Sequence, residues 1–178
     1  MTTPRVELPD DEVREALTAC LAVPRWVDDV AAAAPYGSLD ELVEVARAAA
    51  TPLSASEIDQ AMAHHPRIGE KATGHGQSQA FSRAEQQSST SDDEELAQAL
   101  AAGNAAYEEK FDRVFLIRAA GRSRLEILSE LQRRLKLDPE TERAIVGAEL
   151  RDIALLRIPQ LFAHLDAHAE FDASDAAR

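Results

Sequence analysis

Two adjacent histidines are the residues of this sequence best suited to proton transfer. His64 and His65 precede Pro66, which restricts the backbone of His65 to extended angles and so helps to fix the direction of its ring. Histidine titrates near neutral pH and both donates and accepts protons, which suits general acid or base catalysis. A histidine at the end of a helix is also an ordinary surface feature, and this local pattern alone favours that interpretation.

A hydroxyl and a carboxylate follow further along the chain. Ser82 and Glu85 are three residues apart, so a helix would place both side chains on one face, next to Gln86. Together they could bind a polar ligand. The same spacing is that of a capping box at a helix start, and by itself it favours the capping role.

An arginine lies on a face that otherwise carries residues of the core type. Glu149, Ile153 and Arg157 recur every four residues, which places them along one side of a helix. A guanidinium there requires an anionic partner. Glu149 could supply it as an ion pair, or a ligand carboxylate could bind to the planar fork.

Helix start signals predict the elements that position these residues. Asp10 or Asp11 can cap a first helix, which Pro24 interrupts. Serine three residues before glutamate predicts further helix starts at Ser38, Ser54 and Ser123. Asp138 with Pro139 predicts a long helix running to about His164.

The segments between these starts differ in periodicity. The spacing of apolar residues over 92–110 predicts a helix, in which Leu96, Leu100, Asn104 and Tyr107 lie on related faces. The short run from Val114 to Ile117 is rich in apolar residues, and we expect it to be extended. The helix predicted after Ser123 is rich in leucine and carries Leu125, Leu128, Leu131 and Leu135.

The composition favours helices throughout. The chain has 178 residues with 45% hydrophobic and only 4% aromatic residues, and its seven glycines leave few interruptions. It is long enough to bury one sizeable core. We therefore predict an all-α fold, a compact single-domain helical bundle over residues 1–178, with frayed termini at about 1–8 and 168–178.

Charge and cysteine content exclude several classes of partner. The formal net charge of −13 repels phosphate backbones, so nucleic acid is not an expected partner. No stretch approaches the roughly 18 apolar residues of a membrane span. Cys20 is the single cysteine, the first eleven residues lack an apolar leader and the last three are not a peroxisomal signal, so we expect a cytoplasmic protein.

The motifs in combination are far more specific than any one of them. The chain contains, in this order, His65-Pro66-Arg67-Ile68-Gly69-Glu70, Ser82-x-x-Glu85-Gln86 and Asn104-x-x-Tyr107-x-x-Lys110-Phe111. This set resembles the family of 2-oxo-4-hydroxy-4-carboxy-5-ureidoimidazoline (OHCU) decarboxylases. The likeness continues through Phe115–Ala119 and the helix that contains Arg157, and it covers nearly the whole chain.

The resemblance implies an activity and a site. It implies cofactor-independent decarboxylation of a small ureidoimidazoline to (S)-allantoin, no bound metal and a homodimer. The implied catalytic residues are His65, Glu85 and Arg157. The implied substrate-binding residues are Pro66, Ser82, Arg83, Ala84, Glu85, Gln86, Phe115, Leu116, Ile117, Arg118, Ala119 and Arg157.

The sequence departs from the family pattern at two places near that site. Asp112-Arg113-Val114 stands where relatives often have glycine and proline, and Arg118 stands where a small residue or cysteine is common. Both departures affect the expected shape of one pocket wall.

Two other functions remain open at this point. A metal-dependent hydrolase is suggested by a short cluster of imidazoles and a carboxylate, formed by His64, His65, Glu70 and His75, although its spacing matches no standard ligand motif. A non-catalytic helical interaction module would also fit the helical composition and the capping patterns.

Overall fold

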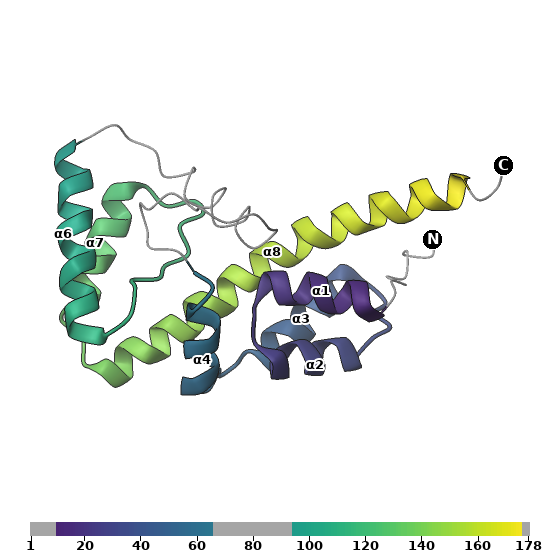
Figure 1. Cartoon of the computed structure of the whole chain (residues 1–178), viewed down its shortest axis with the longest axis horizontal. Helices are drawn as coiled ribbons and strands as arrows, with labels where there is room; N and C mark the ends of the chain where they lie inside the picture. Colours follow the sequence, from purple (N-terminus) through teal and green to yellow (C-terminus); the bar gives the residue numbers. More distant parts are fainter. Residues whose placement is uncertain (1–9, 66–93, 176–178) are drawn as a thin grey trace. The chain divides into compact units, whose positions relative to one another are not determined.

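Seven helices make up most of the part of the chain that the structure describes. The computed structural model describes residues 10–65 and 94–175, with side chains as far as Phe162. No strand occurs in these two ranges, so the all-α prediction is confirmed (Figure 1). The helices are α1 (Asp10–Cys20), α2 (Pro24–Ala32), α3 (Leu39–Ala49), α4 (Ala55–Met62), α6 (Glu94–Phe111), α7 (Arg124–Arg134) and α8 (Pro139–Asp175).

The predicted serines begin their helices, whereas Asp11, one of the two caps considered for the first helix, lies within the first turn of α1. Ser54 and Ser123 form complete capping boxes at the starts of α4 and α7. At α3 the hydroxyl of Ser38 accepts the backbone N–H of Glu41, but the Glu41 carboxylate accepts the N–H of Gly37 instead of that of Ser38. The box at α3 is therefore only half formed.

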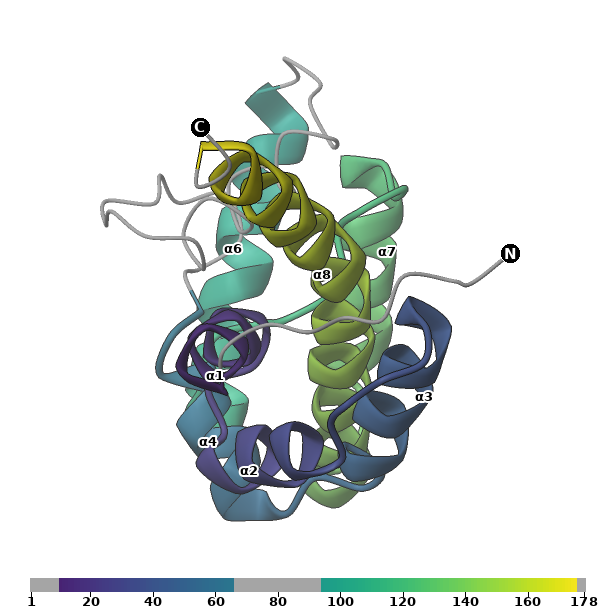
Figure 2. The same ribbon diagram turned by 90° about the vertical axis from the view of Figure 1, so that its right-hand side faces the viewer.

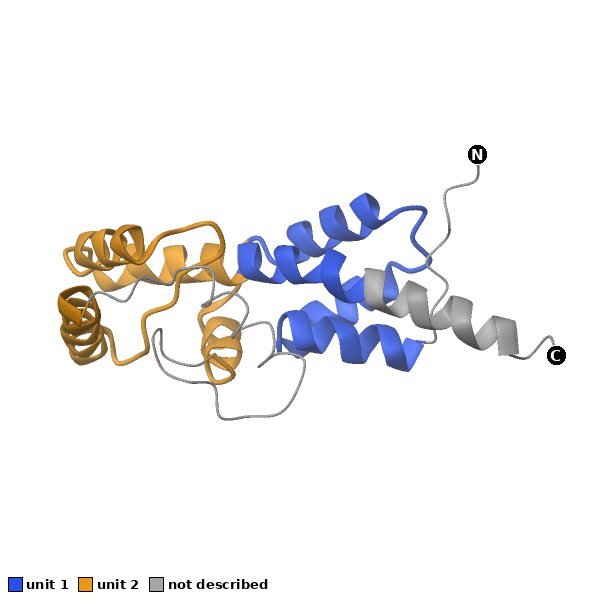
Figure 3. Ribbon diagram, turned by 90° about the horizontal axis from the view of Figure 1, so that it is seen from above, with its two compact units in different colours: residues 1–51, 151–178 blue, residues 52–150 orange. Residues whose placement is uncertain are grey.

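Contacts group the chain into two compact units (Figure 3). The first consists of residues 1–51 and 151–178, and the second of residues 52–150. Helix α8 contributes its first part to the second unit and the rest to the first. The single-domain organisation of the whole chain stays a prediction.

The first unit is built around a buried indole. Trp26 on α2 is completely buried, and its Nε1–H donates to the carbonyl oxygen of Ala46 on α3 at 2.9 Å. The inward side chains of α1, among them Leu17 and Cys20, are buried as well. This bond and the surrounding apolar side chains fix α2 against α3.

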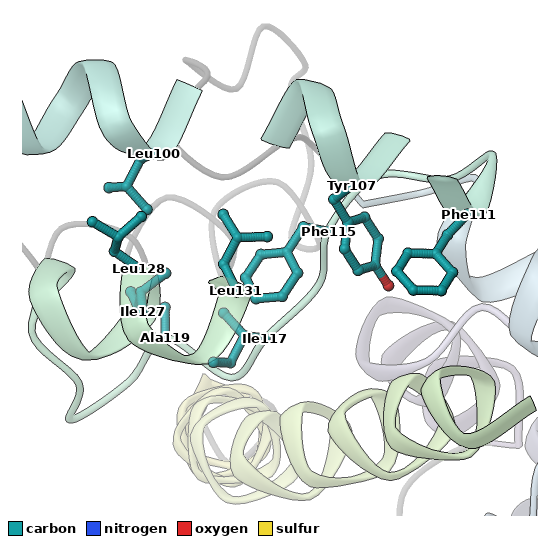
Figure 4. Packing of buried hydrophobic residues seen from close by; sticks show 9 residues of the cluster. All are labelled: Leu100, Tyr107, Phe111, Phe115, Ile117, Ala119, Ile127, Leu128 and Leu131. Atoms are coloured by element: carbon teal, nitrogen blue, oxygen red, sulfur yellow. The ribbon is translucent and has the colours of Figure 1, made fainter. Parts of the chain in front are cut away.

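The second unit contains α4, α6, α7 and the beginning of α8. Helices α6 and α7 lie side by side, as Figure 1 and Figure 2 show. Gly103 permits their close approach, because a Cβ built there would lie 2.6 Å from Leu131 Cδ2. Between them lies one apolar cluster (Figure 4), made of Leu100, Tyr107, Phe111, Phe115, Ile117, Ala119, Ile127, Leu128 and Leu131.

The structure adds one detail to α7 and corrects one prediction about α8. Leu125 of α7 is 65% exposed, and Arg134 occupies the inward position one turn beyond Leu131. Helix α8 continues past its expected end near His164 to Asp175. Alanine is frequent in that extension and it contains neither glycine nor proline, so nothing in it ends the helix.

No helix within residues 10–65 and 94–175 combines the length and apolar character that crossing a bilayer requires.

Candidate functional site

His65 lies immediately after α4, where the sequence placed it. Its backbone N–H donates to the carbonyl oxygen of Met62 at 3.1 Å, and the residue is half-buried. The neighbouring His64 is exposed, and its Nδ1 lies 3.1 Å from the carbonyl oxygen of Gln60. The two imidazoles therefore occupy different environments, and only His65 is partly removed from water.

Several predicted site residues lie outside the described residues. These are Pro66, Ser82, Arg83, Ala84, Glu85 and Gln86, and their placement near His65 stays a prediction. Glu70 and His75 of the alternative metal cluster lie in the same gap. Among the residues that the structure does describe, no group of three or more histidine, cysteine, aspartate or glutamate side chains could hold a metal ion.

The predicted substrate-contact segment, residues 115–119, lies outside any helix, between α6 and α7. Phe115, Ile117 and Ala119 are buried in the apolar cluster of the second unit (Figure 4). Leu116 and Arg118 alternate with them and lie outside this cluster; Leu116 is buried as well, and Arg118 is half-buried. Membership of the cluster at every second residue is the pattern of extended backbone, and no helical turn occurs between residues 114 and 119.

Two side chains hold the backbone of this segment by hydrogen bonds. Arg134 Nη1 donates to the carbonyl oxygen of Leu116 at 2.8 Å, and the backbone N–H of Arg118 donates to Glu149 Oε2 at 2.7 Å. Because backbone groups two residues apart in an extended chain point the same way, both bonds lie along one edge of the segment. The guanidinium of Arg134 also lies over the Phe115 ring, 4.7 Å from its centroid.

A turn ends the segment. The backbone N–H of Arg122 donates to the carbonyl oxygen of Ala119 at 3.0 Å, and Gly121 between them has φ 78°. This left-handed angle favours glycine. At the other end of the segment, Asp112 follows α6 with φ 53°, so an aspartate holds a conformation that glycine adopts at lower cost. This is one of the two departures from the family pattern.

Arg134 is itself held in a buried triad with Glu142 and Tyr107. Arg134 Nε lies 2.9 Å from Glu142 Oε1, and the hydroxyl of Tyr107 donates to the same carboxylate oxygen. None of the three residues is more than 1% exposed. Burial, together with the hydrogen bond to Glu142, raises the pKa of Tyr107, so its hydroxyl stays a donor at neutral pH.

The structure gives two residues of the family-like motif on α6 a structural role. Tyr107 binds Glu142 near the start of α8. Lys110, one turn further along, donates from Nζ to the carbonyl oxygens of Leu135 and Leu137, each at 2.7 Å. These carbonyls follow α7, so the motif connects α6 to the passage from α7 into α8.

Arg157 belongs to the first unit, whereas His65 and the 115–119 segment belong to the second. Arg157 is 2% exposed, and its Nη1 donates to the carbonyl oxygen of Cys20 at 3.3 Å. Glu149, the ion-pair partner considered for Arg157, instead accepts the backbone N–H of Arg118 and lies 3.8 Å from Arg122 Nη2.

The thiol of Cys20 is buried as well. Burial raises its pKa to about 12.

Sequence reasoning missed Arg134 and Glu142. One signal could have found the arginine: it lies three residues after Leu131 and seven after Ile127, which is the spacing of one helix face. A charged residue at the end of an apolar stripe requires a buried counter-charge. No sequence spacing identified Glu142 as that partner.

The fold and these residues define a protein that is all-α in its described ranges, with a half-buried histidine after a short helix and a non-helical segment held by a buried arginine and a half-buried glutamate. A family model described as OHCU decarboxylase matches residues 6–159 of the chain. The chain belongs to the OHCU decarboxylase family. It is therefore an enzyme, a carboxy-lyase, and the resemblance inferred from the sequence motifs is confirmed.

Solved structures show the same fold. A crystal structure of OHCU decarboxylase in the presence of (S)-allantoin is 25% identical, with a TM-score of 0.67, and the match covers 84% of this chain and 98% of the other. A crystal structure of (S)-allantoin synthase is 14% identical, with a TM-score of 0.61, and the match covers 86% of this chain and 51% of the other. No curated protein matched the sequence.

Proposed function

We propose that this chain converts OHCU to (S)-allantoin in urate breakdown, with His65, Glu85 and Arg157 as catalytic residues. The observation that carries the proposal is the family match over residues 6–159, a range that includes all three. The half-buried position of His65 supports its part in the site, because a partly desolvated imidazole suits proton transfer better than the exposed His64.

The substrate itself can accept the electrons that decarboxylation releases. Its carboxylate and a hydroxyl share one ring carbon, beside a carbon–nitrogen double bond. When the bond to the carboxylate breaks, its electron pair forms a carbon–carbon double bond, the pair of the C=N bond moves to the ring nitrogen, and that nitrogen takes a proton. The resulting enol gives up its hydroxyl proton, and the carbon bearing the ureido group gains one. Carbon dioxide and allantoin account for all atoms of the substrate anion and of one added proton, which the ring nitrogen takes up.

This chemistry assigns roles to the proposed residues. His65 bonds to the substrate near its hydroxyl and carboxylate and moves a proton, while Glu85 orients the imidazole or the substrate. The guanidinium of Arg157 binds an anionic or carbonyl oxygen. Backbone groups of residues 115–119, with Ser82 and Gln86, bond to the ureido and ring atoms. A single fixed orientation then gives one enantiomer.

We further propose a cofactor-free, cytoplasmic homodimer. The substrate's own C=N bond makes an added electron sink unnecessary, and a lone buried cysteine fits a reducing compartment. Leu125 on α7, 65% exposed, supplies apolar surface for a second copy. Light scattering coupled to gel filtration measures the assembly, metal analysis and chelator treatment test for a cofactor, and cell fractionation tests the compartment.

An enantioselective assay tests the reaction. OHCU is generated in situ from urate with the two enzymes that precede this step, the protein is added, and circular dichroism follows the product. We expect rapid appearance of the signal of (S)-allantoin. A rate and an enantiomer ratio equal to those of spontaneous decay would rule out the proposed reaction.

A further inference from the structure

The 115–119 segment is held by charged side chains that do not belong to the predicted substrate-binding set. Its carbonyl at Leu116 accepts from Arg134 at 2.8 Å, and its N–H at Arg118 donates to Glu149 at 2.7 Å. These two bonds occupy one edge of the segment. In extended backbone the N–H and C=O groups of Ile117 point to the opposite edge, away from both side chains.

Arg134 can hold the segment because its own position is fixed from the other side. The guanidinium has five donors in a rigid plane, and in this protein it uses Nε and Nη2 for Glu142 and Nη1 for Leu116. Tyr107 donates to the same carboxylate, and its ring lies 5.2 Å from the ring of Phe115 in an edge-on arrangement. Glu142 and Tyr107 thereby orient the fork that binds the segment.

Burial makes this arrangement stiff. The side chains of the triad, Arg134, Glu142 and Tyr107, are each at most 1% exposed, so water does not compete for their hydrogen bonds. If one partner moved, the other would remain buried without a hydrogen bond, which is costly in free energy. Glu149 is less enclosed, with 13% of its side chain exposed, and it also faces Arg122. The segment is thus fixed at one point by a buried fork and at the other by a half-buried carboxylate.

We propose that Arg134 and Glu149 are positioning residues for catalysis, which hold the backbone of residues 115–119 at the geometry that substrate binding and turnover require. The proposal rests on the proposed function, because that function assigns substrate contacts to this segment. It adds two residues that touch no substrate and act through the backbone they hold. A displacement of about 1 Å in such a segment can cost about 100-fold in rate.

The competing explanation is that Arg134 serves stability alone. Arg134→Lys separates the two, because an ammonium keeps the positive charge for Glu142 but lacks the planar fork that reaches Glu142 and Leu116 together. Arg133→Lys is the matched control: it is the same change on the adjacent residue of α7, where the side chain is 54% exposed and pairs with Glu130. Glu149→Ala tests the second attachment, the bond to the backbone N–H of Arg118, and removes only a half-buried group.

The experiment measures kcat and KM for each variant well below its unfolding temperature, and hydrogen exchange of the peptide covering residues 113–122. We expect Arg134→Lys and Glu149→Ala to lose about 10- to 100-fold in kcat/KM and to exchange faster in that peptide, whereas Arg133→Lys matches the original chain in both. If Arg134→Lys does not fold, Glu149→Ala carries the test.

Two other outcomes are decisive. Lower unfolding temperatures with unchanged kcat/KM in the folded variants would overturn the positioning role and leave stability as the only one. If the unsubstituted protein does not accelerate the reaction, the proposed function is refuted instead. The hydrogen-exchange data would still show whether the two side chains hold the segment.

Discussion

Arg134 and Glu142 form an ion pair that is completely enclosed by protein. Arg134 Nε lies 2.9 Å from one carboxylate oxygen of Glu142 and 3.1 Å from the other, and the two side chains are 0% and 1% exposed. Desolvating two charges is costly, so such a pair is maintained only when further hydrogen bonds complete it. Tyr107 and the carbonyl of Leu116 provide them.

Breaking this pair should destabilise the protein strongly. We expect Arg134→Met or Glu142→Leu alone to cost about 3–5 kcal/mol, because each leaves one buried charge without its counter-charge. The double variant removes both charges and should cost less than the sum of the two by about 1–3 kcal/mol. Urea unfolding of the three variants measures the coupling, and strictly additive losses would contradict it.

The two imidazoles should differ sharply in their effect on turnover. We expect His65→Ala to lower kcat by about 10²- to 10⁴-fold, the usual contribution of a positioned acid or base. His64→Ala is the matched control, and it should keep its activity because His64 is exposed and bonded to its own helix. The allantoin assay compares both variants. Equal activity of His65→Ala and the original chain would remove His65 from the mechanism.

Gly103 should not tolerate a methyl group, although it lies within a helix. Alanine normally gains about 1 kcal/mol over glycine in a helix interior. At Gly103 the new Cβ would lie 2.6 Å from buried Leu131, and we expect a net loss of about 1–3 kcal/mol from overpacking. At Gly147 the nearest atom is 3.2 Å away on Ile58, so Gly147→Ala should cost less. Thermal unfolding ranks the two, and the reverse order would refute the explanation.

Glycine in place of Asp112 should stabilise the protein. With φ at 53°, the aspartate occupies the left-handed region, which costs a residue with a side chain about 1–2 kcal/mol and glycine nothing. We expect Asp112→Gly to raise the free energy of unfolding by about 0.5–1 kcal/mol, and Asp112→Ala to lower it. Urea denaturation compares them, and a change of the same sign in both would show that φ is not the cause.

The free energy of unfolding should decrease as the pH rises above 9, because of the buried thiol of Cys20. Burial raises the pKa of this thiol from 9.0 to about 12, so above pH 9 the unfolded chain releases a proton that the folded chain keeps. The unfolded state then binds fewer protons, and stability declines by at most about 1.4 kcal/mol per pH unit from this group. Tyr36, whose pKa is also raised to about 12, adds to the decline above pH 10.

Cys20→Ala isolates the contribution of the thiol. Its free energy of unfolding should fall less steeply between about pH 9 and 10 than that of the original chain, whatever the constant cost of the substitution. Identical slopes would show that the thiol does not titrate differently on folding.

The amino-acid pattern determined the helices of this protein, because their signals are local. Serine and glutamate three residues apart mark the starts of α4 and α7, and Asp138 with Pro139 marks that of α8. The motifs around His65 and Tyr107 were enough to place the chain in its family. The apolar face of α7 was decided by packing, which buries Ile127 and leaves Leu125 65% exposed.

Tertiary structure alone decided which distant residues meet. Arg134 and Glu142 are eight residues apart on different helices, and Tyr107 comes from a third, so no spacing along the chain links them. Their pairing follows from their burial in the core, because a charge removed from water is costly without a counter-charge. That cost arises only in the folded protein, because the two side chains are removed from water only when the core has assembled.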